Sequence, residues 1–378
     1  MDYWDIVAEL YNTTLSFSFI ILGFLMFYIA TKGLRAKNHY GAISTTVCGV
    51  CFIIFGYYNS VALFFPFPYN GYMVWWIGVV LILNILFAII SKRFIKGMAN
   101  DLGLEEEQGT SHLRRYIIRM TQHDPYEEEI SIRMEVIRKS FHLSGFLIWV
   151  AFYGFLFIPP ITQIINDSII VMINQIGPAY TILWGPISMY PYPVGAPQAI
   201  AGLTMMALIG SLVFAIISDI FRILWGPEYS VFNFITHSML RDKERNAAGP
   251  HIYIMVGFIL SFMLYMMELL DISAYFAGIL IACLSDAAAA LIGRIFGKHK
   301  VKVRSKETKS IEGFIAGVVV AYVIGLIIVG PIYAIIGATI FLITDYYPKY
   351  TADNILNPIL IPIGIQFFIV ILQLPVGW

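Results

Sequence analysis

The sequence predicts an all-α, polytopic membrane protein with roughly ten transmembrane helices. Of its 378 residues, 59% are hydrophobic and only 13% are charged, and the mean hydropathy is +0.77. A soluble globule of this size needs a more polar surface than this composition supplies. Apolar runs near the ~20 residues needed to cross the hydrocarbon core recur along the chain. We expect these runs to be helical, because backbone polar groups in lipid must be satisfied within each segment.

The apolar runs that we assign to spans follow one another from near the N-terminus to near the C-terminus. They lie at about 13–30, 41–65, 72–90, 140–160, 198–218, 251–269, 272–292, 311–329, 330–344 and 357–374. No basic region precedes the first run and no small-residue cleavage site follows it before Lys32, so we expect it to be retained. The three cysteines, Cys48, Cys51 and Cys283, lie in apolar spans and are expected to be buried.

The basic residues are distributed asymmetrically, although the formal net charge is +0. They fall at 32–37, 92–96, 114–139, 222–245, 294–309 and 349, and none occurs between Lys139 and Arg222. With ten spans, all basic stretches lie on one side, which the positive-inside rule makes cytoplasmic. Both termini and the Pro/Gly/aromatic segment 159–197 are then external. The protein belongs in the plasma membrane if prokaryotic and in the endoplasmic reticulum if eukaryotic.

Residues 1–135 form an N-terminal extension that contains three spans and most of the polar segment 92–139. The acidic runs of this segment, at 105–107 and 127–129, are typical of solvated helix faces. We expect two amphipathic helices here, either lying on the membrane or packed under the helical bundle.

Asp286 is the most informative residue of the sequence. It lies two helical turns before Gly293, which places it roughly 10 Å from the end of its helix at ~1.5 Å rise per residue. An ionisable group at that depth is costly and is a functional-site hypothesis by default. Four alanines after Asp286, together with Gly293 and Gly297, let another helix or a ligand approach the backbone closely.

A cluster of basic and partly basic residues follows this helix, between two apolar spans. Its members are Lys298, His299, Lys300, Lys302, Arg304, Lys306 and Lys309. A nucleotide triphosphate can neutralise such a cluster, with Asp286 and Glu312 holding the accompanying magnesium. Alternatively, a basic cytoplasmic loop only fixes topology and contacts anionic lipid headgroups.

Further polar residues fall on the same predicted side. Arg138 and His142 are four residues apart on one helical face, where they can meet phosphate or an acid. Asp219 and Arg222 share a face by their spacing of three, and Arg241 follows in the same loop. Without the other clusters, the latter residues would be interpreted as ordinary salt bridges.

The last predicted cytoplasmic loop contains oxygen donors beside an interrupted helix. It includes Asp345, and Asp353 and Asn354 stand just before a span broken by prolines. Such donors suit a metal or phosphate site. They also suit an N-terminal cap for the final helix, and the two roles are compatible.

Four motifs follow one another along the chain. They are Arg138-Lys-x-x-His142-x-x-Gly145, Asp286-x-x-Ala-x-x-x-Gly-x-x-Phe-Gly-Lys298-x-Lys300, Lys309-Ser-Ile-Glu-Gly313 and Asp353-Asn-x-x-x-Pro358. In this order they resemble the CTP-dependent lipid kinases, which comprise dolichol kinase, phytol kinase and the CTP-using diacylglycerol kinase. The resemblance covers about 138–374, so we predict a lipid kinase-like membrane domain at 136–378. Ser285, Ser310 and Asn357 depart from the usual pattern.

The resemblance implies transfer of the γ-phosphoryl group of CTP to the hydroxyl of a membrane lipid alcohol, with Mg²⁺ and with dolichol or another polyprenol favoured. It implies catalytic roles for Asp286, His142, Asp219 and Arg222. The nucleotide-binding set is Lys298, His299, Lys300, Lys306, Lys309, Gly293, Gly297, Gly313, Arg138 and Arg241. The metal-binding set is Asp286, Glu312, Asp353 and Asn354.

Two other functions stay open from the sequence. A cytidylyltransferase that makes a CDP-lipid would use the same nucleotide, metal and basic loop, and a lipid transporter or scramblase would line its path with Asp286. The expected partners are a lipid alcohol, a nucleotide and the bilayer, with no nucleic acid. The residues do not address the oligomeric state.

Overall fold

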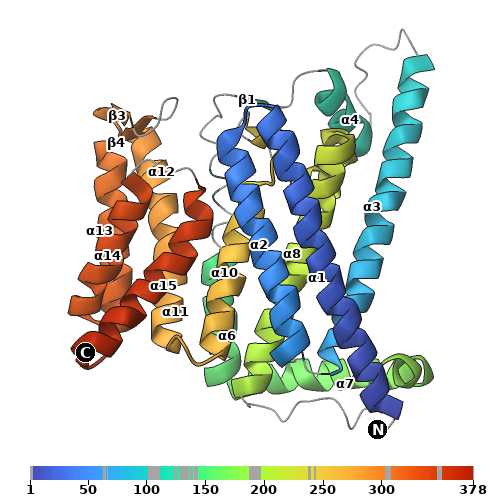
Figure 1. Ribbon diagram of the computed structural model, residues 1–378, viewed down its shortest axis with the longest axis horizontal. Helices are drawn as coiled ribbons and strands as arrows, with labels where there is room; N and C mark the ends of the chain where they lie inside the picture. Colours follow the sequence, from blue (N-terminus) through green and yellow to red (C-terminus); the bar gives the residue numbers. More distant parts are fainter. Residues whose placement is uncertain are drawn as a thin grey trace.

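The computed structural model describes most of the chain. The described residues are 3–62, 65, 67–100, 111–122, 126–127, 136, 139, 144–186, 197–236, 240–241, 244–302, 308–346 and 351–377. Within these residues the protein is a bundle of helices with four very short strands, as Figure 1 shows. The predicted fold class, a helical polytopic membrane protein, agrees with this architecture.

The helices that run along the bundle coincide with the predicted apolar runs. They are α1 (Tyr3–Arg35), α2 (His39–Ala62), α3 (Tyr69–Asn100), α6 (Ser144–Phe157), α8 (Pro197–Trp225), α10 (Pro250–Met266), α11 (Ile272–Leu280) with its continuation α12 (Asp286–Ile295), α13 (Ile311–Val329), α14 (Pro331–Tyr346) and α15 (Asp353–Leu372). Among the described residues, seven helices are long and apolar enough to cross a membrane. Since α6, α10 and α14 are shorter, the count of ten spans stays a prediction.

The two ends of the bundle differ in what they carry. In Figure 1 both chain termini lie toward the lower end, whereas α4 (His112–Gln122), β1 (Tyr126–Glu127), β3 (Lys300–Lys302) and β4 (Thr308–Ser310) lie at the upper end. The upper end thus holds the basic loop that follows α12. This arrangement fits one basic face and one face that carries both termini.

The segment that we expected to be external, 159–197, contains a long helix. It is α7 (Pro159–Trp184), which begins at two prolines and has a non-helical residue at Gly177, before Pro178. Figure 1 shows α7 lying across the lower end of the bundle, close to the N-terminus. Its isoleucines recur three or four residues apart with polar residues between them, so the segment folds as an amphipathic helix outside the bundle.

Two short strand pairs depart from a purely helical fold. The strand β1 pairs in parallel with β2 (Leu240–Arg241), and β3 pairs with β4 as an antiparallel hairpin. In the hairpin, Lys300 lies opposite Ser310 and Lys302 lies opposite Thr308. Basic residues in β3 and β4 thus become neighbours, although they are separated in the sequence.

The polar segment contributes one described helix, which packs against the bundle. Tyr116, Ile117 and Met120 of α4 are buried, and they contact Phe87 of α3 and Phe234 of α9 (Val231–Thr236). Tyr116 donates a hydrogen bond to the carbonyl of Pro227, in the short 3-10 helix η2 (Pro227–Tyr229), at 2.6 Å. Of the two placements expected for this segment, α4 adopts packing under the bundle.

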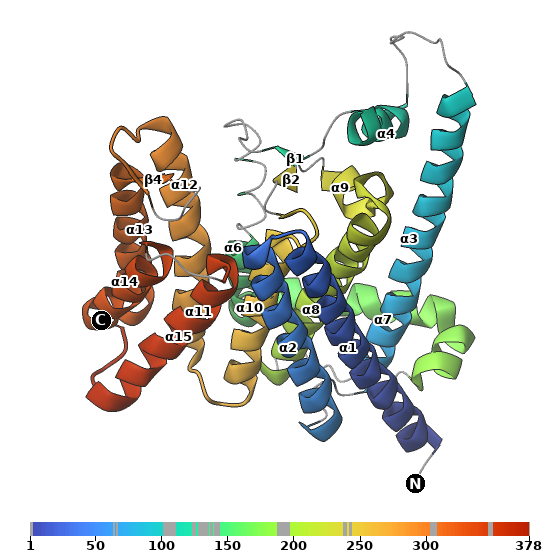
Figure 2. The ribbon, with the colours of Figure 1, turned by 45° about the horizontal axis from the view of Figure 1, so that its top comes forward.

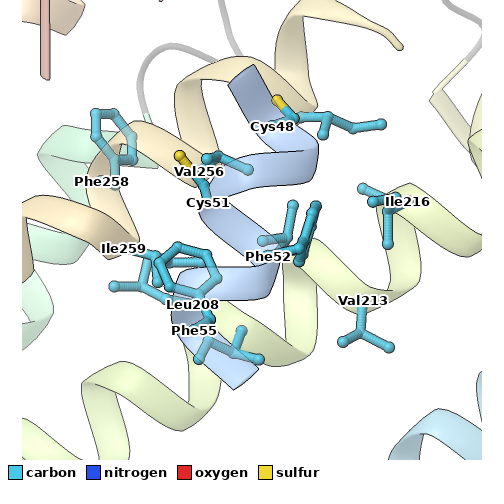
Figure 3. Packing of buried hydrophobic residues seen from close by; sticks show 14 of the residues in the cluster. Cys48, Cys51, Phe52, Phe55, Leu208, Val213, Ile216, Val256, Phe258 and Ile259 are labelled. Carbon is cyan, nitrogen blue, oxygen red and sulfur yellow. The ribbon is translucent and has the colours of Figure 1, made fainter. Parts of the chain in front are cut away.

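A continuous hydrophobic core joins the N-terminal extension to the rest of the protein. Figure 3 shows Phe52 and Phe55 of α2 among side chains of α8 and α10, including Leu208 and Ile259. Cys48 and Cys51 lie in the same cluster, and both are buried, as is Cys283. The expectation of buried cysteines is confirmed. Whether residues 1–135 and 136–378 are separate units stays a prediction.

Candidate functional site

Asp286 stands at an irregularity within a single long helix. The helix runs from Ile272 to Ile295, but residues Ile281–Ser285 form a π-turn, η4, directly before Asp286. Single π-turns inside α-helices are uncommon and occur frequently at functional sites. The carboxylate therefore occupies a position where the backbone departs from regular helical geometry.

The carboxylate of Asp286 forms an ion pair with Lys139. The two side chains are 14% and 13% exposed, so the pair is mostly withdrawn from solvent. A charge in such a place requires a partner, because desolvation disfavours an isolated ion. Asp286 is thus matched by a cation that comes from the end of the polar segment, 147 residues away.

Lys309 lies between two further acids. Its Nζ donates to the carboxylate of Asp345 at 2.6 Å and to the carbonyl of Asp345 at 3.0 Å, and it lies 3.9 Å from the carboxylate of Asp353. Burial by itself lowers the pKa of Lys309, but the negative charges of Asp345, Asp353 and Asp286 raise it above its ordinary value. Asp286 is therefore close enough for its charge to act on Lys309, and the lysine stays cationic at neutral pH.

Together these residues form a cluster of alternating charge at the upper end of the bundle. We call Lys139, Asp286, Lys309, Asp345 and Asp353 the charged cluster. Its members come from the segment before α6, from α12, β4, α14 and α15. Every acid of the cluster is close to a lysine, with Lys309 shared by Asp345 and Asp353, so three carboxylates face two lysines.

Glu312, which we predicted as a metal ligand with Asp286, pairs with His299, a contact that does not test the predicted metal role. The carboxylate of Glu312 lies 2.7 Å from His299 Nδ1, and it accepts from the backbone N–H of His299 at 3.2 Å. The backbone N–H of Ile311 also donates to the His299 carbonyl at 2.9 Å. These bonds close the base of the β3–β4 hairpin, so the structure gives both side chains a local partner there.

The glycines predicted to permit a close approach are used by a neighbouring helix. A methyl group on Gly313 would lie 2.8 Å from the Cα of Gly293, and it would also meet the carbonyl of Ala289. Ser310 Oγ accepts the N–H of Gly313 at the start of α13 and donates to the Gly293 carbonyl at 3.3 Å. The sequence left open whether a helix or a ligand approaches this backbone, and α13 makes the approach.

Gly297 lies beside the same contact, against Ser310. Lys298, Lys300 and Lys302 are exposed. In the hairpin, Lys309 lies opposite Val301, so Lys300 and Lys302 lie on the other face of the strand pair from Lys309. A role for these lysines in binding phosphate stays a prediction.

Asp219 and Arg222 form a buried ion pair in α8, as their spacing of three predicts. The two side chains are 3% and 1% exposed. Arg222 donates to the carbonyls of Glu244 at 3.1 Å and Ala247 at 2.6 Å, and Asp219 accepts from the backbone N–H of Gly249 at 2.9 Å. This geometry clamps the loop that leads into α10. Their predicted catalytic role is not tested by these contacts.

The start of α15 combines a carboxylate with an irregular helix. Asp353 accepts from the backbone N–H of Asn354 at 3.0 Å, within the first turn. Pro362 has no N–H to donate to the carbonyl of Pro358, and the hydroxyl of Ser261 donates to that carbonyl instead. The proline-broken span is thus accommodated by α10, and Asp353 is held at the same end as Lys309.

Several predicted site residues lie outside the described residues. These are Arg138, His142 and Lys306, and for Arg241 only the backbone is described, in β2. The pairing of β2 with β1 places this backbone beside the polar segment.

The donors of the charged cluster suit magnesium, although they do not form a ready-made cage. Carboxylate oxygens are the protein ligands that Mg²⁺ prefers, and this ion is usually held by one or two carboxylates together with substrate phosphates. In the part of the chain that the structure describes, no three His, Cys, Asp or Glu side chains are grouped to hold a metal. The predicted role of Asp286 and Asp353 as ligands of Mg²⁺ stays a prediction.

Lys139 was not among the predicted site residues, and Asp345 was noted only as an oxygen donor of the last predicted cytoplasmic loop. Lys139 stands beside Arg138 in the first motif, and Asp345 is an acid at the end of an apolar span, which is itself a signal of function. A lysine 147 residues from its partner cannot be paired with it from one sequence.

An integral membrane protein with long apolar helices and a charged cluster at one end of its bundle is the class that the fold and the site define. A model of the cytidylyltransferase family matches residues 133–369, well over half of the chain. The chain therefore belongs to this family, which includes CTP-dependent lipid kinases. No curated protein and no solved structure matches it.

Proposed function

We propose that this protein is a membrane kinase that transfers the γ-phosphoryl group of CTP to the hydroxyl of a lipid alcohol, with dolichol or another polyprenol as the favoured substrate. Membership of the cytidylyltransferase family supports an enzyme that uses a cytidine nucleotide. The motifs that resemble lipid kinases favour the kinase within that family.

The observation that carries the proposal is the charged cluster. Asp286, Asp345 and Asp353 are acids at the ends of apolar helices, and Lys139 and Lys309 offset two of these three charges. Phosphoryl transfer needs mainly positioning and neutralisation of charge around an in-line path. Alternating lysines and carboxylates supply both, because the lysines can meet phosphate oxygens while the carboxylates hold a cation.

The proposed reaction forms a bond between the lipid oxygen and the γ-phosphorus, and it breaks the bond between that phosphorus and the bridging oxygen of CDP. The hydroxyl proton leaves as the new bond forms, and an ionised carboxylate near the attacking oxygen can accept it. Asp286 is suited to this place because it lies within an apolar helix that a lipid can reach from the bilayer. Lys309, with its raised pKa, stays positive throughout and can balance the phosphate charge.

Magnesium, when bound, would supply Lewis-acid stabilisation of the phosphate oxygens. Asp286 and Asp353 are the side chains that we propose to hold it, with Asn354 and Glu312 as further predicted ligands. Lys298, His299 and Lys300 would meet the nucleotide from the hairpin. His142, Arg138, Lys306 and Arg241 keep the catalytic or nucleotide-binding roles that the resemblance implies.

The orientation that we propose places the charged cluster and the basic loops in the cytoplasm and both termini outside. Counting ten spans leaves all basic stretches on one side, as the positive-inside rule requires. The membrane is then the plasma membrane of a prokaryote or the endoplasmic reticulum of a eukaryote.

The position of the label in CTP tests the proposal. Purified protein in liposomes with Mg²⁺ and a lipid alcohol receives CTP labelled at either the α or the γ phosphorus. A kinase labels the lipid from the γ position only. The Asp286→Asn variant serves as the control for catalysis by this site, and a panel of polyprenols, phytol-like alcohols and diradyl glycerols identifies the acceptor.

The second candidate is a cytidylyltransferase that forms a CDP-lipid from a lipid phosphate, which the family description favours directly. It attacks the α-phosphorus and releases pyrophosphate. Lipid labelled from the α position, with a lipid phosphate as the acceptor, would establish this function and contradict the kinase.

A further inference from the structure

The turn between α1 and α2 contacts two backbone segments at the end of the bundle that holds the charged cluster. The turn belongs to the N-terminal extension, outside residues 133–369 that match the family. The two segments, 245–248 and 351–353, belong to the matched region. Figure 2, with this end tilted forward, shows the α1–α2 turn beside the upper part of α10.

The first segment is the loop before α10. Asn38 Nδ2 donates to the carbonyl of Arg245 at 3.0 Å, while Asn38 Oδ1 accepts from the N–H of Gly41 and so caps α2. The buried hydroxyl of Thr45 accepts from the N–H of Ala248 at 3.1 Å. The loop that Arg222 and Asp219 clamp from one side is thus held by α2 from the other.

The second segment is the start of α15. The hydroxyl of Ser44, which is 0% exposed, accepts a hydrogen bond from the backbone N–H of Ala352 at 2.9 Å. Ala352 is the N-cap residue of α15, and its carbonyl accepts the N–H of Ile355 at 3.1 Å. The next residue is Asp353, whose carboxylate lies 3.9 Å from Lys309. The hydroxyl of Ser44, which lies outside the region matched by the family, therefore fixes the backbone directly before Asp353.

This bond is buried and crosses 308 residues of sequence. A buried N–H without an acceptor is costly, so the start of α15 is held where Ser44 can reach it. Since Asp353 is attached to that backbone, its carboxylate is oriented by the same bond. Residues that hold a metal-binding carboxylate in its orientation affect the affinity of the site for the metal.

We propose that Ser44 is a positioning residue for Asp353, and that the α1–α2 pair of the N-terminal extension sets the geometry of the cation-binding side of the charged cluster. The inference rests on the proposed function for its biochemical meaning. Its physical content concerns the binding of a divalent cation, which is measured without turnover.

The test measures Mn²⁺ binding to the full-length protein in detergent by electron paramagnetic resonance, with no lipid present and with CDP, which supplies phosphate oxygens but has no γ-phosphoryl group to transfer. Ser44→Ala is expected to raise the Mn²⁺ dissociation constant on the order of 10-fold, as Asp353→Asn does, because both alter the same ligand. The double variant is expected to bind no more weakly than Asp353→Asn alone, because Ser44 acts through Asp353.

A matched control is Ser16→Ala, which removes another buried hydroxyl from the α1–α2 pair. Ser16 accepts from Asn59 Nδ2 at 2.9 Å. Asn59 lies fifteen residues beyond Ser44 along α2, or ~22 Å at ~1.5 Å per residue. This variant is expected to lose stability without changing the Mn²⁺ dissociation constant.

A second variant breaks the same bond from its other side. Ala352→Pro removes the donor N–H, and the φ of −60° at Ala352 already suits proline. It is expected to reproduce the effect of Ser44→Ala on Mn²⁺ binding. Wild-type Mn²⁺ affinity in either variant, or additive losses in the double variant, would overturn the inference.

The labelled-CTP assay distinguishes this inference from the proposed function. If wild-type protein gives no γ-labelled lipid while Ser44→Ala still weakens Mn²⁺ binding, the kinase proposal is wrong and the positioning role of Ser44 stands.

Discussion

Replacing Lys309 by methionine tests whether the charged cluster depends on a balance of charge. The change keeps much of the side-chain volume and removes only the cation between Asp345 and Asp353. Asp345, with a side chain that is 2% exposed, is then left without the lysine that lies 2.6 Å away. We expect the folded state to be destabilised, because an acid buried without its partner is costly.

The distances set the size of the effect. Two unit charges 3.9 Å apart, as Lys309 and Asp353 are, attract by about 4 kcal/mol at an effective dielectric constant near 20, before desolvation is counted. Removing one partner of a buried pair costs about 3–5 kcal/mol in general. Because the side chain of Lys309 is 32% exposed, we expect the lower end, a loss of about 3 kcal/mol of unfolding free energy.

The measurement is unfolding by SDS in mixed micelles, for the wild type and for two comparison variants. Lys300→Met removes an exposed lysine of the same hairpin and is expected to change the unfolding free energy by less than about 0.5 kcal/mol. Adding Asp345→Asn to Lys309→Met is expected to restore most of the loss, because the stranded charge is gone. If Lys309→Met proved as stable as Lys300→Met, the cluster would not be held by charge balance and the argument would fail.

Three further predictions concern the site and its packing. Asp286→Asn is expected to lower the rate of lipid phosphorylation on the order of 10²-fold or more without preventing folding, and a rate near that of the wild type would exclude the carboxylate from the reaction. Gly313→Leu is expected to destabilise the protein by about 1–3 kcal/mol, because the new side chain would separate α13 from α12. Gly78→Leu, whose side chain would enter open space beside α3, should be tolerated. Thermal unfolding of the two variants in detergent measures the difference. The pKa of Lys309 in the folded state is raised above its ordinary value of 10.5. The stabilisation that its charge supplies is therefore complete below pH 10.5 and is lost as the pH rises through the higher, folded-state pKa. The difference in unfolding free energy between the wild type and Lys309→Met should stay constant from about pH 7 to 9 and shrink at more alkaline pH.

The sequence was sufficient to predict the helices along the bundle, because a run of about twenty apolar residues has few alternatives to a helix in lipid. It did not predict α7, because the Pro/Gly/aromatic segment 159–197 was placed outside the membrane without an assigned helix. Pro159 and Pro160 start that helix instead of preventing it, since a proline in the first turn has no N–H to leave unpaired. The hairpin was also missed, because β3 and β4 are three residues each and depend on pairing with one another.

The parts of the candidate site that could be predicted are residues whose local sequence is unusual. Asp286 is one, because an ionisable residue within an apolar segment is energetically costly and usually has a function. Its partner Lys139 is not, because the pairing depends on how α6 and α12 are arranged in space. The same holds for Gly293 and Gly297. Their small size predicted a close approach, but only the structure shows that α13 and its N-cap Ser310 occupy the space.

The π-turn before Asp286 gives its helix a place that can absorb a change in chain length. Successive residues of an α-helix are turned by about 100°. A π-turn, with its i→i+5 hydrogen bonds, spreads about the same rotation over one more residue. Deleting one residue of Ile281–Ser285 is therefore expected to leave an ordinary α-turn and to keep Asp286 directed toward Lys139, whereas the same deletion within Ile272–Leu280 would turn Asp286 by about 100°.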